Sequence, residues 1–288
     1  MKKALLVLVS VLVATACTKD KIISRKSETA IPKQFGAVYG VEDYAEAKER
    51  FGEYTVFGVI PNGGVLIRAV ADAHDSGLSS NSLSIGFMPD KTQRSNRIDA
   101  GDFFINGEKF EFQDVAYMPG NLNEDERREF TENLFGQEVS ISLEQGDQTI
   151  VSSNFRAPVL LTQLDVANSS PVSPSVDVRW ISLEENITIN WNADPLNENG
   201  LVLMLTSQGD KYNAPKPGPK ETHLTAVFIE EDDGAYTIPD SFFQGLTEDQ
   251  LINLTLYRGK FDYIKDDGRG YDYKFYALSE ISGYFAVR

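Results

Sequence analysis

The sequence predicts an all-β protein of two consecutive antiparallel β-sandwich domains, with small helical insertions in the first. Short runs rich in Val, Ile, Phe and Tyr recur along the chain, and turn-forming Gly, Asn, Asp and Pro residues separate them. Runs of this length and spacing are typical of sandwiches and barrels. Because the chain of 288 residues contains a single Cys, no intramolecular disulfide can form, and apolar burial has to stabilise the fold.

The first domain is expected over residues 36–168. Asn106 and Gly107 stand between two apolar runs, which predicts a tight hairpin. The strands expected in this domain are 54–60, 65–71, 83–88, 109–112, 139–143 and 149–154.

Two segments of the first domain have helical patterns. Asn123, with Glu126 three residues later, makes the start of a capping box, and Gly136 provides a stop signal. A second helix is expected over 42–50. The acidic residues of the helix that begins after Asn123 are typical of a solvated face.

The second domain is expected over residues 169–288. Ser, Asn and Pro concentrate over 168–175, which predicts a domain boundary near residue 168. Seven short strands, one of the first bearing Trp191, indicate an immunoglobulin-like sandwich. These strands are expected at 187–191, 201–206, 223–229, 235–238, 251–258, 273–279 and 283–287.

Three segments of the second domain carry a family resemblance. Residues 187–194 (ITINWNAD), 199–203 (NGLVL) and 232–239 (DDGAYTIP) resemble the C-terminal immunoglobulin-like domain of exported lipoproteins of the Bacteroidota type. The resemblance implies a fold and brings no catalytic residues with it.

The first sixteen residues predict a cleaved signal peptide. A positively charged start precedes an apolar run over 4–13, which is too short to span a bilayer as a helix. Small residues then stand directly before Cys17. This pattern resembles the lipobox of bacterial lipoproteins, with Ala14 where Leu is usual, and implies that Cys17 is lipidated. The alternative is an ordinary secretory peptide followed by a free thiol.

Charge separates a tether from the body. The chain has a net charge of −16, whereas residues 18–33 contain five basic and two acidic residues. This fits a flexible tether over 17–35 near an anionic lipid surface, and an acidic body for which a nucleic-acid partner is not expected. Thr18, after the Cys, favours the outer membrane, with the periplasmic and cell-surface faces both open.

Groups suited to catalysis are scarce. His74 and His223 are the only histidines, and no Gly-x-Ser-x-Gly elbow is present. Zinc is not expected, because the single Cys is assigned to lipid and the histidines lack ligand spacing. A hydrolase that uses two carboxylates stays an alternative, although among 43 acidic residues such pairs arise by chance.

Calcium is the one metal that the composition keeps open, because it prefers oxygen ligands. Two loops concentrate Asp and Asn, but neither has the EF-hand order, and such turns also form for backbone reasons alone. No cofactor is expected, with calcium as the alternative. The first loop carries Asn192, Asp194, Asn197 and Asn199, and the second carries Asp262, Asp266, Asp267 and Asp272.

Aromatic residues crowd the last 32 residues of the chain. Strand alternation assigns most of them to the core. Tyr263 and Tyr271 flank the acidic loop and are the candidates for stacking on a ligand.

These patterns predict a membrane-anchored extracytoplasmic lipoprotein that acts as a non-catalytic binding or structural module. The alternatives are a carbohydrate-binding accessory of a surface polysaccharide-uptake system and the carboxylate-dependent hydrolase. The expected partners are the membrane, through the lipid, and a glycan or an envelope protein.

Overall fold

The computed structural model describes residues 22–27, 63–74, 78–88, 97–113, 116–120, 122–173, 176–207, 222–265 and 271–288. Over these ranges the chain forms three β-sheets and one α-helix, so the prediction of an all-β sandwich-type fold is confirmed. The predicted strand at 54–60 and the predicted helix at 42–50 lie outside the described residues.

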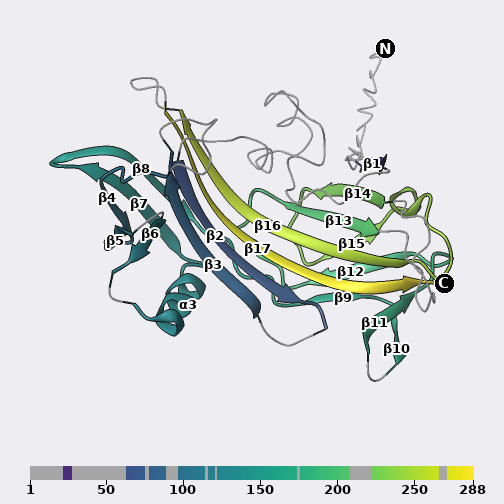
Figure 1. Ribbon diagram of the computed structural model, residues 1–288. Coiled ribbons are helices and arrows are strands. Elements are labelled where there is room, and N and C mark those ends of the chain that lie inside the picture. The colour runs from purple at the N-terminus through teal and green to yellow at the C-terminus, as the bar shows by residue number, and fades with distance from the viewer. Residues whose placement is uncertain are drawn as a thin grey trace, which may run out of the picture.

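The largest sheet has nine strands and extends along the molecule (Figure 1). From one edge its order is β1, β14, β13, β16 and β17, and beyond β17 it divides. One part of β17 pairs with β2, which pairs with β3, and its C-terminal part pairs with β11, which pairs with β10. The strands are β1 (Ile22–Ser27), β2 (Gly63–Asp72), β3 (Leu78–Phe87), β10 (Ser170–Ser173), β11 (Val176–Ile181), β13 (Leu201–Ser207), β14 (Thr222–Ile229), β16 (Leu251–Lys265) and β17 (Asp272–Val287).

A five-stranded sheet completes the first sandwich. Its order is β6, β5, β4, β7 and β8, and its buried side chains share one core with those of β2, β3 and β17. Asn106 and Gly107 both have positive φ and form the predicted turn between β4 and β5. The strands are β4 (Asp102–Ile105), β5 (Glu108–Gln113), β6 (Ala116–Pro119), β7 (Glu138–Gln145) and β8 (Gln148–Arg156).

The single described α-helix, α3 (Glu124–Asn133), connects β6 to β7. Its start confirms the predicted capping box, because Asn123 Oδ1 accepts from the Glu126 N–H and the Glu126 carboxylate accepts from the Asn123 N–H. Gly136, with φ of 75°, provides the predicted stop just after it.

A three-stranded sheet completes the second sandwich. It contains β9 (Leu164–Val166), β12 (Ile187–Trp191) and β15 (Ala235–Ile238) and faces β13, β16 and β17. If these six strands are lettered A, B, E, C, F and G, the two sheets pair as ABE and CFG. This is the strand arrangement of an immunoglobulin-type sandwich.

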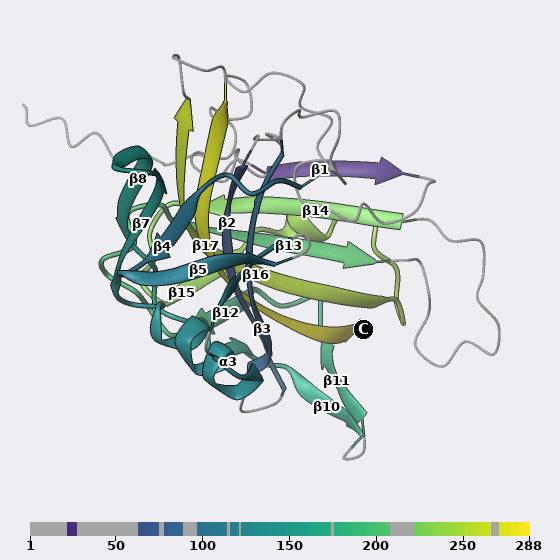
Figure 2. The same ribbon diagram turned by 60° about the vertical axis from the view of Figure 1, so that its left-hand side comes forward.

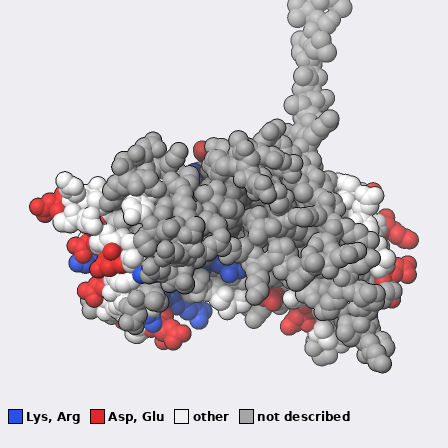
Figure 3. All heavy atoms as spheres, turned by 45° about the horizontal axis from the view of Figure 1, so that its top comes forward, with Lys and Arg blue, Asp and Glu red and all other residues white. Residues whose placement is uncertain are grey.

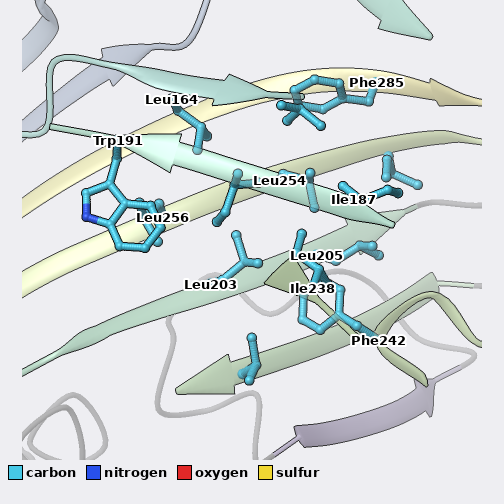
Figure 4. Close-up of a cluster of buried hydrophobic side chains, with 14 of the residues drawn as sticks. Leu164, Ile187, Trp191, Leu203, Leu205, Ile238, Phe242, Leu254, Leu256 and Phe285 are labelled. Atoms are coloured by element: carbon cyan, nitrogen blue, oxygen red, sulfur yellow. The ribbon is translucent and has the colours of Figure 1, made fainter. Parts of the chain in front are cut away.

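The core of the second sandwich surrounds Trp191. In Figure 4, side chains from both sheets point into the space between them, and the indole lies next to Leu256. Phe242, on the short 3-10 helix η2 (Asp240–Phe243), is fully buried in the same core. Burying one such large apolar side chain contributes about 1.5–3 kcal/mol.

The hairpin of β16 and β17 belongs to both sandwiches. Residues of odd number on β17 point to one face, where Tyr273 and Phe275 enter the first core and Ile281 and Phe285 enter the second. The two smaller sheets therefore lie next to each other on one face of the long sheet. The division into domains at residues 36–168 and 169–288 stays a prediction. Residues of β17, near the end of the chain, contribute side chains to the first core.

The predicted strands at 273–279 and 283–287 are one continuous strand, β17, which corrects the expected break. Gly283 lies inside this strand. A Cβ there would approach Ala73 Cβ to 2.9 Å and His74 Nε2 to 3.1 Å. The glycine therefore marks a close approach of the 73–74 turn and not the end of a strand.

Residues 22–27, within the predicted tether, form β1, which pairs antiparallel with β14 and provides one edge of the long sheet (Figure 2). The rest of the tether and the predicted signal peptide lie outside the described residues. Among the described residues, no helix has both the length and the apolar character needed to cross a membrane.

Candidate functional site

The chain crosses from the first sandwich to the second through residues 157–163, which belong to no strand. Side chains from the second sandwich form hydrogen bonds with the backbone of this crossing segment. The Leu161 N–H donates to Ser279 Oγ over 2.7 Å, and Asn192 Nδ2 donates to the Leu160 carbonyl over 2.6 Å. Because unpaired buried backbone groups are costly, these bonds hold the crossing segment in one conformation.

A fully buried ion pair lies beside the crossing segment. Arg258 Nε lies 2.7 Å from Asp232 Oδ2, and both side chains are at most 1% exposed. Arg258 also donates to the Val159 carbonyl over 3.1 Å and to the Asn192 carbonyl over 2.6 Å. Trp191 Nε1 donates to Asp232 Oδ1 over 2.7 Å. The buried charges are thus paired with each other and hydrogen-bonded to the crossing segment and to the second sandwich.

Asp194 makes a second connection at the same junction. Its Oδ2 accepts from Arg156 Nη1 over 3.0 Å and from the Val159 N–H over 2.8 Å, and its Oδ1 accepts from the Leu196 N–H over 3.2 Å. Burial disfavours the charged form, but these donors outweigh it and hold the pKa of Asp194 below its ordinary value. The carboxylate therefore stays ionised and fixes the 194–199 loop against the end of β8.

A cleft of about 370 Å³ opens beside this junction. The first sandwich contributes the ends of β7 and β8, the second contributes the 196–199 loop, and β16 contributes Lys260. The lining residues are Glu138, Asn154, Phe155, Arg156, Pro158, Leu196, Asn197, Glu198, Asn199 and Lys260.

The lining of the cleft is polar and balanced in charge. Two cationic and two carboxylate side chains face amides from both sandwiches, while Leu196 is 67% exposed and offers an apolar surface. Donors and acceptors beside one apolar contact suit a ligand with many hydroxyl groups. The cleft also lies between two packed units, where ligand sites are common.

The first loop rich in Asp and Asn, which was weighed as a calcium alternative, forms part of the junction. Asn192 Oδ1 accepts from the Thr162 N–H, and Asn197 Oδ1 accepts from the Asn199 N–H over 3.2 Å. The side-chain oxygens of Asn192, Asp194 and Asn197 thus accept hydrogen bonds from N–H donors of the protein itself. Asn197 and Asn199 in addition line the cleft.

In the second loop, which carries the candidate calcium ligands, the structure describes the side chain of Asp262 alone. Asp262 is half-buried on β16 and accepts a short hydrogen bond from Ser153 Oγ on β8. Asp266, Asp267 and the side chain of Asp272 lie outside the described residues. Within the described part of the chain, no three His, Cys, Asp or Glu side chains are grouped to hold a metal ion.

The two stacking candidates are in different positions. Tyr271 is half-buried and packs against the first core, which limits the ring face that a ligand could reach. The backbone of Tyr263 pairs with Lys274 on β17, and its side chain is outside the described residues. Tyr271 is not among the residues that line the cleft.

His74 has a packing role. Its Nε2 lies 3.2 Å from the Tyr284 carbonyl, and its ring contacts Phe285 edge-on at 5.4 Å. His223 lies on β14 with its side chain outside the described residues, and Cys17 lies outside them altogether.

Sequence reasoning missed Arg156, Asp232, Arg258 and Lys260. Arg258 carried a readable signal, because it continues the core-facing alternation of Ile252, Leu254 and Leu256 with a charged residue. A cation at a core position requires a buried partner. The identity of that partner depends on the tertiary fold.

The fold and the cleft define an all-β protein in which two sandwiches are joined by a shared hairpin. No family model matches the chain, and no curated protein matches it as a relative.

Proposed function

We propose that this protein is a lipid-anchored extracytoplasmic binding protein without catalytic activity, and that the cleft between its two sandwiches holds a segment of a glycan. The observation that carries the proposal is the cleft itself, which two hydrogen-bonded sandwiches form and which has amides, charged groups and one exposed apolar side chain in its wall.

The junction supports a binding role. The crossing segment, the buried ion pair and Asp194 hold both walls of the cleft in fixed positions. A preorganised site loses less conformational entropy when it binds its ligand. Hydroxyl groups of a sugar can exchange bonds with water for bonds with the amide and charged side chains, while its C–H face packs on Leu196.

The sequence supports the anchor. The charged start, the short apolar run and the small residues before Cys17 fit a processed lipoprotein. The non-catalytic reading rests on the scarcity of histidine and on the packing role of His74. The outer membrane is the proposed location.

The anchor is tested by expressing the full chain in a bacterium fed with an alkyne-labelled fatty acid. We expect label on the wild-type chain and none on Cys17→Ser, with the labelled protein in the outer-membrane fraction. Equal labelling of the two chains, or an unlabelled wild type in the soluble fraction, contradicts the anchor.

The cleft is tested by screening residues 18–288 on a glycan array, with and without calcium. We expect binding to one glycan class, and loss of that binding in Leu196→Ser and in Lys260→Gln. Val176→Ser is the matched control, because Val176 is also an exposed apolar residue, at 40%, and does not line the cleft. Binding that survives both cleft changes contradicts the proposed site, and release of reducing sugar from a bound glycan favours the hydrolase.

A further inference from the structure

The first strand of the long sheet begins at the level of the junction between the sandwiches. Residues in register with the start of β1 form one row across the sheet, which contains Ile22, Val227, Leu203, Leu256 and Ile281. The buried Arg258, which bonds the crossing segment, follows shortly after this row on β16. The chain therefore enters the sheet beside the middle of the long hairpin and not at either of its ends.

The cleft lies in the direction in which β1 leads back toward the N-terminus. β1 and β13 are both antiparallel to β14, and β16 is antiparallel to β13, so this direction is also the one from Leu203 to Leu201 and from Leu256 to Lys260. Lys260 lines the cleft. With strands about 4.8 Å apart and a rise of about 3.3 Å per residue, Lys260 lies about 20 Å from Ile22.

A short anchor segment, residues 17–21, joins this row to the proposed lipid. It separates Cys17 from the start of β1 at Ile22. Even when fully extended, a chain of this length spans at most about 18 Å. The two distances together keep the wall of the cleft within about 40 Å of the anchor, whatever the orientation of the body.

The far end of the first sandwich is not bound to the anchor in this way. The hairpin of β7 and β8 has Glu138 and Arg156 at its cleft end and turns at Gly146 and Asp147. Between Asp147 and Arg156 the strand rises by about 30 Å. In Figures 1 and 2 this hairpin extends away from β1. The cleft is thus close to the anchor point, and the turn is distant from it.

Charge favours an orientation with the middle of the body toward the lipid. In the view of Figure 3, carboxylates gather at both ends of the molecule and basic side chains are visible toward its middle. An anionic lipid surface repels the two ends more strongly than the middle, and it attracts Lys19 and Lys21 of the anchor segment. Exposed Glu230 and Glu231 follow β14 and oppose direct contact of the sheet edge with such lipid. The anchor segment therefore holds the body beside the lipid, with space between them.

We propose that the edge of the long sheet formed by β1 and β14 faces the membrane, so that the cleft works next to the lipid surface and the turn at Gly146 is directed away from it. The inference rests on the lipid anchor of the proposed function and does not depend on which glycan the cleft binds. It limits that glycan to one that reaches within about 40 Å of the membrane.

The test measures energy transfer from a dye on the protein to an acceptor lipid. The full chain, purified with its lipid in non-ionic detergent, is added to vesicles of phosphatidylglycerol and phosphatidylethanolamine that contain a rhodamine-labelled lipid. Cys17 is the single cysteine of the chain, so an introduced cysteine is the one free thiol of the lipidated protein. Glu198→Cys places the dye at the cleft and Asp147→Cys places it at the distant turn. The two variants are matched, because each replaces an exposed acid.

We expect energy transfer from position 198 to be at least about two-fold more efficient than from position 147, because the turn lies about 30 Å farther along β8. Insertion of about twenty Gly and Ser residues after Thr18 adds about 25 Å of reach and should lower the transfer from position 198. Tryptophan fluorescence checks that each variant is folded.

Three outcomes overturn the inference. Equal transfer from the two positions, or stronger transfer from position 147, in a chain that floats with the vesicles overturns the orientation and leaves the anchor standing. A wild-type chain that does not float with the vesicles overturns the anchor and the orientation together. Unchanged transfer from position 198 after the insertion would mean that the anchor segment does not set the distance between the cleft and the lipid.

Discussion

Arg258 of β16 and Ser279 of β17 are direct partners in the ladder, and both are fully buried at the point where the two hydrophobic cores meet. On β17, core-facing side chains before Ser279 enter the first core and those after it enter the second. On the antiparallel β16, the side chains before Arg258 enter the second core. Arg258 bonds Asp232 and the crossing segment, and Ser279 accepts from Leu161. A polar pair therefore stands where one long hairpin passes from the first sandwich to the second.

Replacement of Arg258 by Met should strongly destabilise the protein. The change leaves the carboxylate of Asp232 buried without its counter-charge, which costs about 3–5 kcal/mol. Urea unfolding of residues 18–288, followed by tryptophan fluorescence, measures the loss. Arg128→Met is the control, because Arg128 and Glu132 form a largely exposed pair on α3 that contributes about 0–1 kcal/mol. Equal losses for the two variants would refute a stabilising role for the buried pair.

Tyr117 fixes the chain segment that enters β4. Its hydroxyl accepts from the Ala100 N–H over 2.7 Å and from the Gly101 N–H over 3.1 Å. Tyr117→Phe leaves both backbone donors without this acceptor, which should lower the free energy of unfolding by about 1–3 kcal/mol at pH 7. Urea unfolding measures the change.

The same residue should make the fold sensitive to alkali. Burial, followed by the nearby Asp99, raises the pKa of Tyr117 above its ordinary value of 10. The stability from the neutral hydroxyl is present below pH 10 and is lost as the pH rises above it, because the unfolded chain then releases the proton more readily. We expect Tyr117→Phe to lose less stability than the wild type between pH 9 and pH 11. Parallel unfolding curves for the two proteins over this range would contradict the assignment.

Local patterns predicted much of the fold. The apolar alternation of β12 and β15, the Asn106–Gly107 turn and the capping box of α3 each depend on residues close in sequence. The continuity of β17 was not predictable in this way, because Gly283 reads as a break until the 73–74 turn packs against it.

The candidate sites were harder to predict than the strands. Asp194 and Asn197 were recognised as an unusual cluster, but the hydrogen bonds that join them to Arg156, Val159 and Asp232 span 35 to 38 residues of sequence. The first core needs a parallel pairing of β2 with β17, in which Gly63 pairs with Tyr273 and Asp72 with Ser282. No local pattern encodes such a pairing.

Lys274 should reduce stability at neutral pH. Burial lowers its pKa to about 8 from the ordinary 10.5. In the window between these values the unfolded chain binds the proton and the folded chain does not, so stability should rise as the pH increases from 8 to 10.5. The difference corresponds to about 3 kcal/mol. Lys274→Met should therefore be more stable than the wild type at pH 7 and should lose this rise, as followed by urea unfolding at a series of pH values.

The neighbouring Tyr276 does not provide the same rise in stability between pH 8 and pH 10.5. Burial raises the pKa of Tyr276, while Arg68 nearby opposes that effect, so Tyr276 lowers stability in alkali. A variant that is less stable than the wild type at pH 7 would show that Lys274 has a structural role instead.

Removal of β1 should expose one edge of the long sheet. Residues 22–27 pair with 222–227 of β14, and each ladder hydrogen bond contributes about 0.5–1.5 kcal/mol. We expect a chain of residues 28–288 to be less stable than one of 18–288 and to self-associate, because an open strand edge pairs readily with another molecule. Light scattering measures the association, and amide hydrogen exchange over 222–229 measures the opening of the edge. A monomeric 28–288 chain with unchanged exchange in this strand would show that β14 does not depend on β1.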